Sequence, residues 1–270
     1  MSRDDASLTD WLATPPGRYL LAWETAQFEQ AVSDIFGYHA LQLGFPQLDA
    51  LGNNRMPHRW LAIDSVVPLK LSDTFDALPT GFARAPAFVA DPAALPFAPA
   101  SLDLLAMPHT LEMSADPHAA LREAERVLVP EGRVIITGLN PNSLWGFRQS
   151  RSRWYGRLRA DEAATSPFLP GAHEMIGYWR LRDWLRLLNF EVESARFGAY
   201  VPSFASQKWL DRFSWMDTLG QRWWPIFGAM YCVVAVKRVR GMRLLEPGWK
   251  ARKAVAAAPA AVASKDSAAR

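Results

Sequence analysis

Residues 87–138 read AFVADPAALPFAPASLDLLAMPHTLEMSADPHAALREAERVLVPEGRVIITG, a stretch in which short apolar runs enclose one helical segment. The runs Phe88–Ala90, Leu102–Met107 and Val134–Thr137 are compact and apolar, which predicts buried strands. Asp116-Pro117 predicts a helix start, because an acid caps the first turn and proline fits the first helical position. This order predicts an α/β fold whose mostly parallel sheet is covered on both faces.

The flanking sequence extends the alternation in both directions. Upstream, Arg18–Phe36 has apolar residues at helical spacing and stops at Gly37, and we expect strands at His39–Gly44 and Trp60–Asp64. Pro15-Pro16-Gly17 is expected to end a shorter helix before it. Downstream, a helix, a strand, a second helix and a last strand are expected at Tyr178–Leu188, Phe190–Arg196, Ser206–Trp224 and Met230–Val236.

Three regions are expected along the chain. We predict an N-terminal helical segment at residues 1–36 and a doubly wound α/β domain at 37–240 with a helical cap insert at about 140–177. Beyond about Arg240 the chain turns to Ala, Lys, Pro and Ser, with no aromatic residue after Trp249, and such a composition predicts a disordered tail at 241–270.

The composition limits the class of protein. Half of the residues are hydrophobic and 21% are charged, which is typical of a globular domain with a core. The single cysteine, Cys232, cannot form an intrachain disulfide. The N-terminus lacks the apolar run of a signal peptide, and no apolar stretch has the length of a spanning helix, so a cytoplasmic protein is expected. A net charge of +3 does not by itself indicate nucleic-acid binding.

The stretch 87–138 resembles the type 11 branch of the class I methyltransferases. Four landmarks occur in the family's order: Asp91 followed by Leu95-Pro96-Phe97, then Ser101-Leu102-Asp103, then Asp116-Pro117 leading into a helix, then Pro130-Glu131-Gly132-Arg133 before a strand. The resemblance implies a Rossmann-like sheet of seven strands with an antiparallel last strand. It also implies S-adenosylmethionine as cofactor and methyl donor.

Two acids are candidates for holding the nucleoside of that donor. Asp64 follows Gly44 by about twenty residues, the usual interval between the first-turn glycine and the ribose-binding acid of dinucleotide folds. Asp91 matches the family position that accepts a hydrogen bond from the adenine amino group. Acids after strands also cap helices, so neither residue alone decides the function.

The family's first loop is altered in this chain. Where an acid and three glycines are typical, residues 42–48 read QLGFPQL, so that Gln42 replaces the acid and Gly44 is the glycine that remains. Glycines let a backbone approach a ligand closely, and Pro46 removes an N–H donor. Gln42 and Gly44 are therefore cofactor-binding candidates in a loop that either binds the donor in a changed manner or has lost it.

His109 is the candidate catalytic residue. It follows the fourth strand, where the family places residues that face the acceptor, and a neutral imidazole could take a proton from a hydroxyl or an amine. The alternative is that it packs the turn into the next helix. The other histidines and Cys232 have no metal-ligand spacing, so no metal is expected.

Residues 145–159 mix tryptophan with arginine beyond the fifth strand. This insert is expected either to recognise an apolar or anionic small-molecule acceptor, with peripheral membrane contact, or to bury its tryptophans while the arginines stay solvated. Nucleic acid is not expected as a partner.

Three functions follow for the whole chain. Methyl transfer from S-adenosylmethionine to a small-molecule acceptor is preferred, and the alternative is a catalytically inactive methyltransferase-like binding or regulatory protein. A nicotinamide oxidoreductase is disfavoured, because Gly44 lacks the other glycines of that fingerprint.

Overall fold

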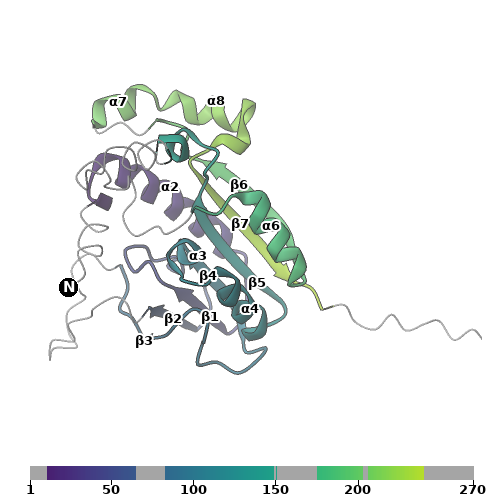
Figure 1. Ribbon diagram of the computed structural model, residues 1–270. Coiled ribbons are helices and arrows are strands. Elements are labelled where there is room, and N and C mark those ends of the chain that lie inside the picture. Colours follow the sequence, from purple (N-terminus) through teal and green to yellow (C-terminus); the bar gives the residue numbers. More distant parts are fainter. Residues whose placement is uncertain (1–10, 65–82, 149, 151–174, 203–205, 240–270) are drawn as a thin grey trace, which may run out of the picture. The chain divides into compact units, whose positions relative to one another are not determined.

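The computed structural model describes residues 11–64, 83–148, 150, 175–202 and 206–239. Within them lies one seven-stranded sheet of order β3-β2-β1-β4-β5-β7-β6 (Figure 1). The strands are β1 (His39–Leu43), β2 (His58–Ile63), β3 (Phe88–Val89), β4 (Leu102–Pro108), β5 (Leu128–Leu139), β6 (Phe190–Gly198) and β7 (Met230–Lys237). The first five pair in parallel, whereas β7 runs antiparallel to β5 and β6. The predicted α/β fold is confirmed, including its antiparallel last strand.

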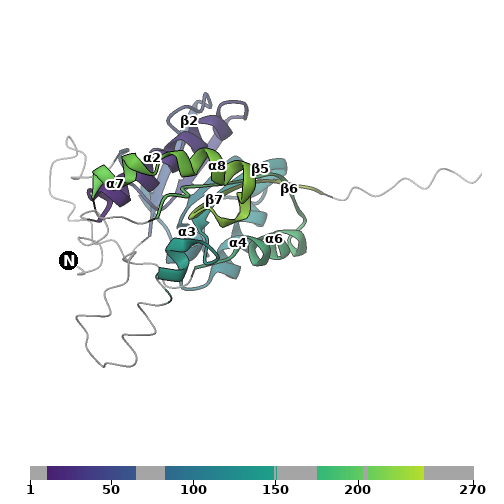
Figure 2. The same ribbon diagram turned by 90° about the horizontal axis from the view of Figure 1, so that it is seen from above.

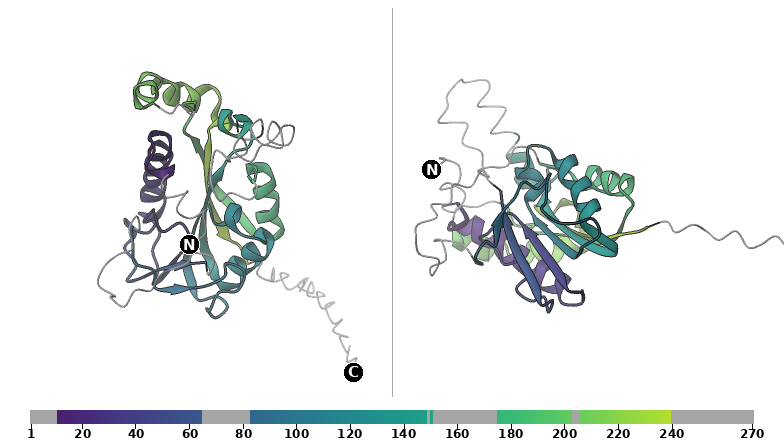
Figure 3. Two further views of the ribbon diagram at one scale, coloured as in Figure 1. Left: turned by 60° about the vertical axis from the view of Figure 1, so that its left-hand side comes forward. Right: turned by 90° about the horizontal axis from the view of Figure 1, so that it is seen from below.

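Helices cover both faces of this sheet (Figure 3). On one face, α2 (Pro15–Val32) packs Phe28 and Val32 against apolar residues of β1, β4 and β5. On the other, α4 (Pro117–Val127) and α6 (Tyr178–Leu187) pack Leu121 and Leu181 against the opposite side of the same strands. Burial on both sides explains why these strands read as nearly continuous apolar runs.

The start of α2 corrects one expectation. Trp11 and Leu12 are helical and this short stretch stops before Pro15, as expected, but Pro15-Pro16-Gly17 also forms the first turn of α2. The Thr14 hydroxyl caps α2 by accepting a hydrogen bond from the Gly17 N–H. Proline is compatible with the first turn, because its missing N–H has no intrahelical partner there.

Other helix ends follow the sequence signals. Asp116 caps α4 by accepting a hydrogen bond from the Ala119 N–H at 2.9 Å, and Asn189 takes the predicted left-handed conformation after α6 with a φ of 60°.

The single helix expected at Ser206–Trp224 is instead two helices, α7 (Gln207–Arg212) and α8 (Trp215–Trp223). The Ser214 hydroxyl donates to the Asp211 carbonyl at the break, in competition with the helical pattern. The 3-10 turn η2 (Pro225–Phe227) then leads into β7.

Most of the predicted cap insert, at 151–174, and the tail at 240–270 lie outside the described residues, so the expected division into three regions stays a prediction. Across the described residues, no helix combines the length and apolarity needed to cross a bilayer.

Candidate active site

The carboxyl ends of neighbouring strands bring predicted site residues to one edge of the sheet. Gly44 follows β1, Asp64 follows β2, and His109 follows β4. Because β1 lies between β2 and β4, chain connections leave it in opposite directions, and open α/β sheets bind ligands at such a switch point. Asp91 follows β3 at the same edge. The sheet therefore gathers these residues where a nucleotide-like ligand is expected.

The turn after β1 leaves room beside Gly44. Gly44 and Phe45 have positive φ angles of 71° and 48°, so the chain reverses sharply there. A Cβ built on Gly44 would meet the Thr110 hydroxyl oxygen at an ordinary contact distance of 3.8 Å. The backbone can thus be approached closely, as a donor-binding loop requires, although the positive φ still favours glycine.

Gln42 is bound by its own loop. It is fully buried, and its amide nitrogen lies within hydrogen-bonding distance of the carbonyls of Gly44, Phe45 and Leu48, at 3.2, 3.2 and 2.8 Å. Its amide oxygen accepts from the Ala50 N–H at 2.9 Å. These contacts give Gln42 the role of holding residues 44–50, and a contact with the donor would require the amide to leave them. The predicted cofactor contact of Gln42 stays a prediction.

The bulky residues of this loop pack toward α2. Leu48 is 2% exposed and joins Phe28, Val32 and Ile35 in the cluster beneath that helix. Leu48 therefore extends the core on the α2 side of the sheet.

Asp91 presents its carboxyl group to solvent at the start of a braced segment. Its Oδ1 accepts from the Ala93 N–H at 2.8 Å. Further on, the Arg126 guanidinium donates to the carbonyls of Leu95 and Phe97, and the Leu95 N–H donates to Glu123. The hydrogen bond from Arg126 lowers the pKa of Glu123, which keeps this brace ionised at neutral pH. Asp91 is thus available to a ligand on a firmly held loop.

His109 lies between two buried carboxyl groups. Its Nδ1 is 2.8 Å from Glu112 Oε2, and its Nε2 is 3.4 Å from Oε2 of Glu24, which comes from α2. The Thr137 hydroxyl donates to Glu24, and the Leu139 N–H donates to Glu112 at 2.6 Å. This His109 cluster (Glu24, His109, Glu112 and Thr137) ties α2 to the ends of β4 and β5.

The cluster sets the charge of the imidazole. Burial lowers the pKa of His109, but the charge of Glu24 and the hydrogen bond to Glu112 outweigh burial and raise it to about 10. Burial also raises the pKa of Glu112, against the opposing effect of its hydrogen bonds. His109 is accordingly an imidazolium at neutral pH with both ring nitrogens engaged, so in this arrangement it has no lone pair to accept a proton.

A family model described as "Methyltransferase domain" matches residues 52–136. The matched residues run from the loop before β2 into β5 and include Asp64, Asp91 and His109, and the sheet has the strand order that the resemblance implies. Residues 52–136 therefore resemble a methyltransferase domain, and the sheet that contains them has the class I methyltransferase fold. The match begins after Gln42 and Gly44, so it includes the two acids but not the altered loop.

The chain is similar to other proteins in sequence and in structure. The protein YafS of Escherichia coli (strain K12) is 43% identical over 109 residues, which make up 40% of this chain and 41% of YafS, so the match spans less than half of that relative. An S-adenosylmethionine-dependent methyltransferase from Thermotoga maritima has a TM-score of 0.58 at 17% identity, over 87% of this chain and 97% of that one. A chain from the complex of the Haloferax volcanii Trm112 methyltransferase activator with a methyltransferase has a TM-score of 0.51 at 16% identity, over 87% and 99%. These two structures share the fold.

Two carboxylates of the His109 cluster were missed from the sequence. The buried face of α2 repeats every four residues and is otherwise apolar, but it contains one acid: Leu20, Glu24, Phe28 and Val32. Such an acid signals a buried partner, which is His109. Glu112 follows His109 by three residues, a spacing that brings two side chains together in one helical turn.

Proposed function

We propose that this protein is a methyltransferase that holds S-adenosylmethionine by its nucleoside end, through Asp64 and Asp91, and transfers the methyl group to a small-molecule acceptor. The observation that carries the proposal is the placement of two acids and an approachable Gly44 backbone at one switch point, within the segment that matches the family. The bound donor would supply a methyl group on a sulfonium, which is a good leaving group.

The residues present fit the nucleoside better than the amino-acid end of the donor. Asp91 keeps an exposed carboxyl group for an adenine amino group, and Asp64 follows β2 where a ribose-binding acid is expected. At the other end, the Gln42 amide is bonded to its own loop, and Glu24 and Glu112 face His109. The proposal therefore assigns affinity to the two aspartates and assigns loop stability to Gln42.

His109 enters the proposal as a positioning residue. Methyl transfer can proceed by alignment and desolvation, and a general base is required only when the acceptor must lose a proton early. An imidazolium held by Glu24 and Glu112 fixes α2 against the carboxyl edge of the sheet. The predicted catalytic role of His109 as a base stays a prediction, and it would require the cluster to open.

Equilibrium binding of S-adenosylmethionine to the full chain tests the proposal. We expect saturable binding to the native protein, and weaker binding to Asp64→Ala and to Asp91→Ala. Asp183→Ala is the matched control, because Asp183 is an exposed acid on α6, an element that carries none of the site residues. Full affinity in both site variants would overturn the assignment.

A binding or regulatory protein without activity is the second candidate, and the altered loop is the observation that favours it. It predicts no donor affinity at millimolar concentration by a chain that melts normally. That result would reject methyl transfer while leaving the fold assignment in place.

A further inference from the structure

The connection from β6 to β7 exposes an unusual number of large aromatic side chains. Trp209, Trp215, Trp223, Trp224 and Phe227 are 50%, 54%, 67%, 60% and 57% exposed, and we call these five residues the aromatic face. Leu219 and Ile226, on the same elements, are also exposed. Tryptophan is normally highly buried, and a contiguous apolar patch on a protein surface marks an interaction site.

The elements that present this face are firmly anchored from below. Asp217, on the inner side of α8, accepts hydrogen bonds from the Tyr19 hydroxyl at 2.6 Å and from the Tyr200 N–H at 2.8 Å. The Tyr200 hydroxyl donates to the Pro225 carbonyl, and Gly220 packs so closely on the Tyr200 ring that a Cβ would lie 2.3 Å from it. The outward aromatic side chains are therefore a property of the folded state and not of a loosely attached segment.

The charges around the face are mostly positive. Lys208, Arg212 and Arg222 are exposed on α7 and α8. Of the two acids in these helices, Asp211 is exposed and bonded to Gln207, while Asp217 is turned inward. The outer side of α7–α8 thus pairs indole rings with cations, and it complements a negatively charged surface.

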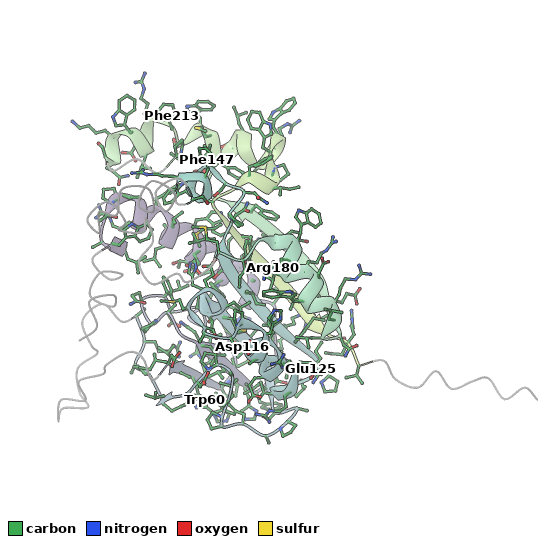
Figure 4. The ribbon with its side chains drawn as sticks, viewed as in Figure 1. Trp60, Asp116, Glu125, Phe147, Arg180 and Phe213 are labelled. Carbon is green, nitrogen blue, oxygen red and sulfur yellow. The ribbon has the colours of Figure 1, made fainter. Side chains whose placement is uncertain are left out.

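The face lies at the same edge of the sheet as the candidate active site. It links the end of β6 to the start of β7, next to the end of β5, where the Asn140 side chain donates to the carbonyls of Ile226 and Gly228. Seen from above, α7 and α8 lie across this end of the molecule, with α7 over α2 (Figure 2). Phe213 and Phe147 are in this part of the protein (Figure 4), and the Phe147 side chain is exposed.

We propose that the aromatic face docks the protein on an anionic lipid bilayer. Tryptophan is enriched at the level of the lipid headgroups, where its ring lies among acyl chains and its N–H stays polar. Lysine and arginine next to such rings reach the phosphates, and the combination is typical of interfacial helices that lie on a membrane without crossing it. The surface differs from the predicted insert at 145–159, most of which lies outside the described residues, and the inference does not depend on methyl transfer.

Vesicle flotation of the full chain tests this docking. The protein is mixed at low salt with vesicles of phosphatidylcholine plus phosphatidylglycerol, and in parallel with phosphatidylcholine alone. We expect flotation with the anionic vesicles, less flotation without the anionic lipid, and release as salt is raised. Trp223→Ala/Phe227→Ala should weaken binding by roughly tenfold or more, because two exposed rings that would be buried in the bilayer are lost.

The matched control removes two aromatic side chains from the opposite edge of the sheet. Phe36 and Tyr38 are both 71% exposed before β1, and Phe36→Ala/Tyr38→Ala should float like the native protein. Arg212→Glu/Arg222→Glu keeps the rings and should lose preference for the anionic vesicles. Circular dichroism melting verifies that each variant is folded.

Three results would overturn the inference. The first is no flotation with anionic vesicles at low salt, and the second is equal loss of binding in the test and control pairs. The third is a stable dimer in light scattering that Trp223→Ala/Phe227→Ala dissociates without any vesicle binding, which would assign the face to a second copy of the chain.

Discussion

Two loops at the carboxyl edge of the sheet use their polar side chains in opposite ways. In the loop after β1, Gln42 points inward and is bonded to the backbone of residues 44–50. In the loop after β3, Arg126 and Glu123 brace the backbone from α4, which leaves the Asp91 carboxyl exposed. The difference teaches that, of two loops at one edge of a sheet, one can use its polar side chain to hold its own backbone while the other presents a carboxyl group to solvent.

The largest expected effect concerns the His109 cluster, against which the inward loop packs through Phe45, whose ring lies 5.1 Å from that of His109. The pKa of His109 in the folded protein is raised from 6.5 to about 10. The stability that the charged imidazole contributes to the folded protein is therefore fully present below pH 6.5 and is lost as pH rises toward 10. The stability difference between the native protein and His109→Gln should fall by on the order of 4 kcal/mol over that range.

Urea unfolding of both proteins at a series of pH values measures this difference. Subtracting the variant removes the contribution of titrating groups that do not interact with His109, and the remaining difference belongs to His109 together with Glu24 and Glu112. A difference that stays constant between pH 6.5 and 10 would show that His109 is neutral in the folded protein.

The next effect is on the inward loop. Gln42→Glu restores the acid that the family has, but a carboxylate cannot donate to the carbonyls of Phe45 and Leu48. We expect this variant to lose about 3 kcal/mol of stability in chemical denaturation, because a buried charge would face unpaired acceptors. Unchanged stability together with tighter donor binding would mean that Gln42 belongs to the donor site.

A smaller effect is expected on the outward loop. Asp91→Ala should weaken binding of S-adenosylhomocysteine by roughly tenfold, equivalent to about 1.4 kcal/mol, with little change in melting temperature, because the side chain is exposed. Fluorescence or calorimetric titration gives the affinity. The opposite pattern, a large loss of stability with no loss of affinity, would make Asp91 a structural cap.

The smallest effect is expected for the brace itself. Arg126→Ala removes the guanidinium that donates to Leu95 and Phe97 and pairs with Glu123. Because the guanidinium is partly exposed, the cost should be only about 1 kcal/mol in urea unfolding. Arg122→Ala on the same helix is the control, since its guanidinium is more exposed and only approaches Asp116 at 4.0 Å.

The sequence predicted the fold because local signals and tertiary packing agree. Strands β4 and β5 are apolar on both sides, and Asp116-Pro117 and Asn189 mark helix ends by mechanisms that need no tertiary partner. The start of α2 was placed too late, at Arg18, because proline can follow one helix and also begin the next, and the Thr14 cap shows that it does so here.

The site was predicted less completely. Spacing located Gly44, Asp64, Asp91 and His109 at one edge, because strand ends in a parallel sheet share an edge. It could not show that Glu24, 85 residues before His109 in the sequence, is 3.4 Å from it in the fold, nor that the Gln42 amide turns back on its own loop. Both facts depend on how a helix and a loop pack, which composition and spacing leave open.

Calorimetric titration of the full chain with S-adenosylhomocysteine, repeated after saturation with adenosine and after saturation with methionine, tests the central claim most directly. If the donor is held by its nucleoside end, adenosine should suppress the binding heat and methionine should leave it nearly unchanged. Suppression by methionine alone, or no binding of S-adenosylhomocysteine at millimolar concentration, would contradict the account.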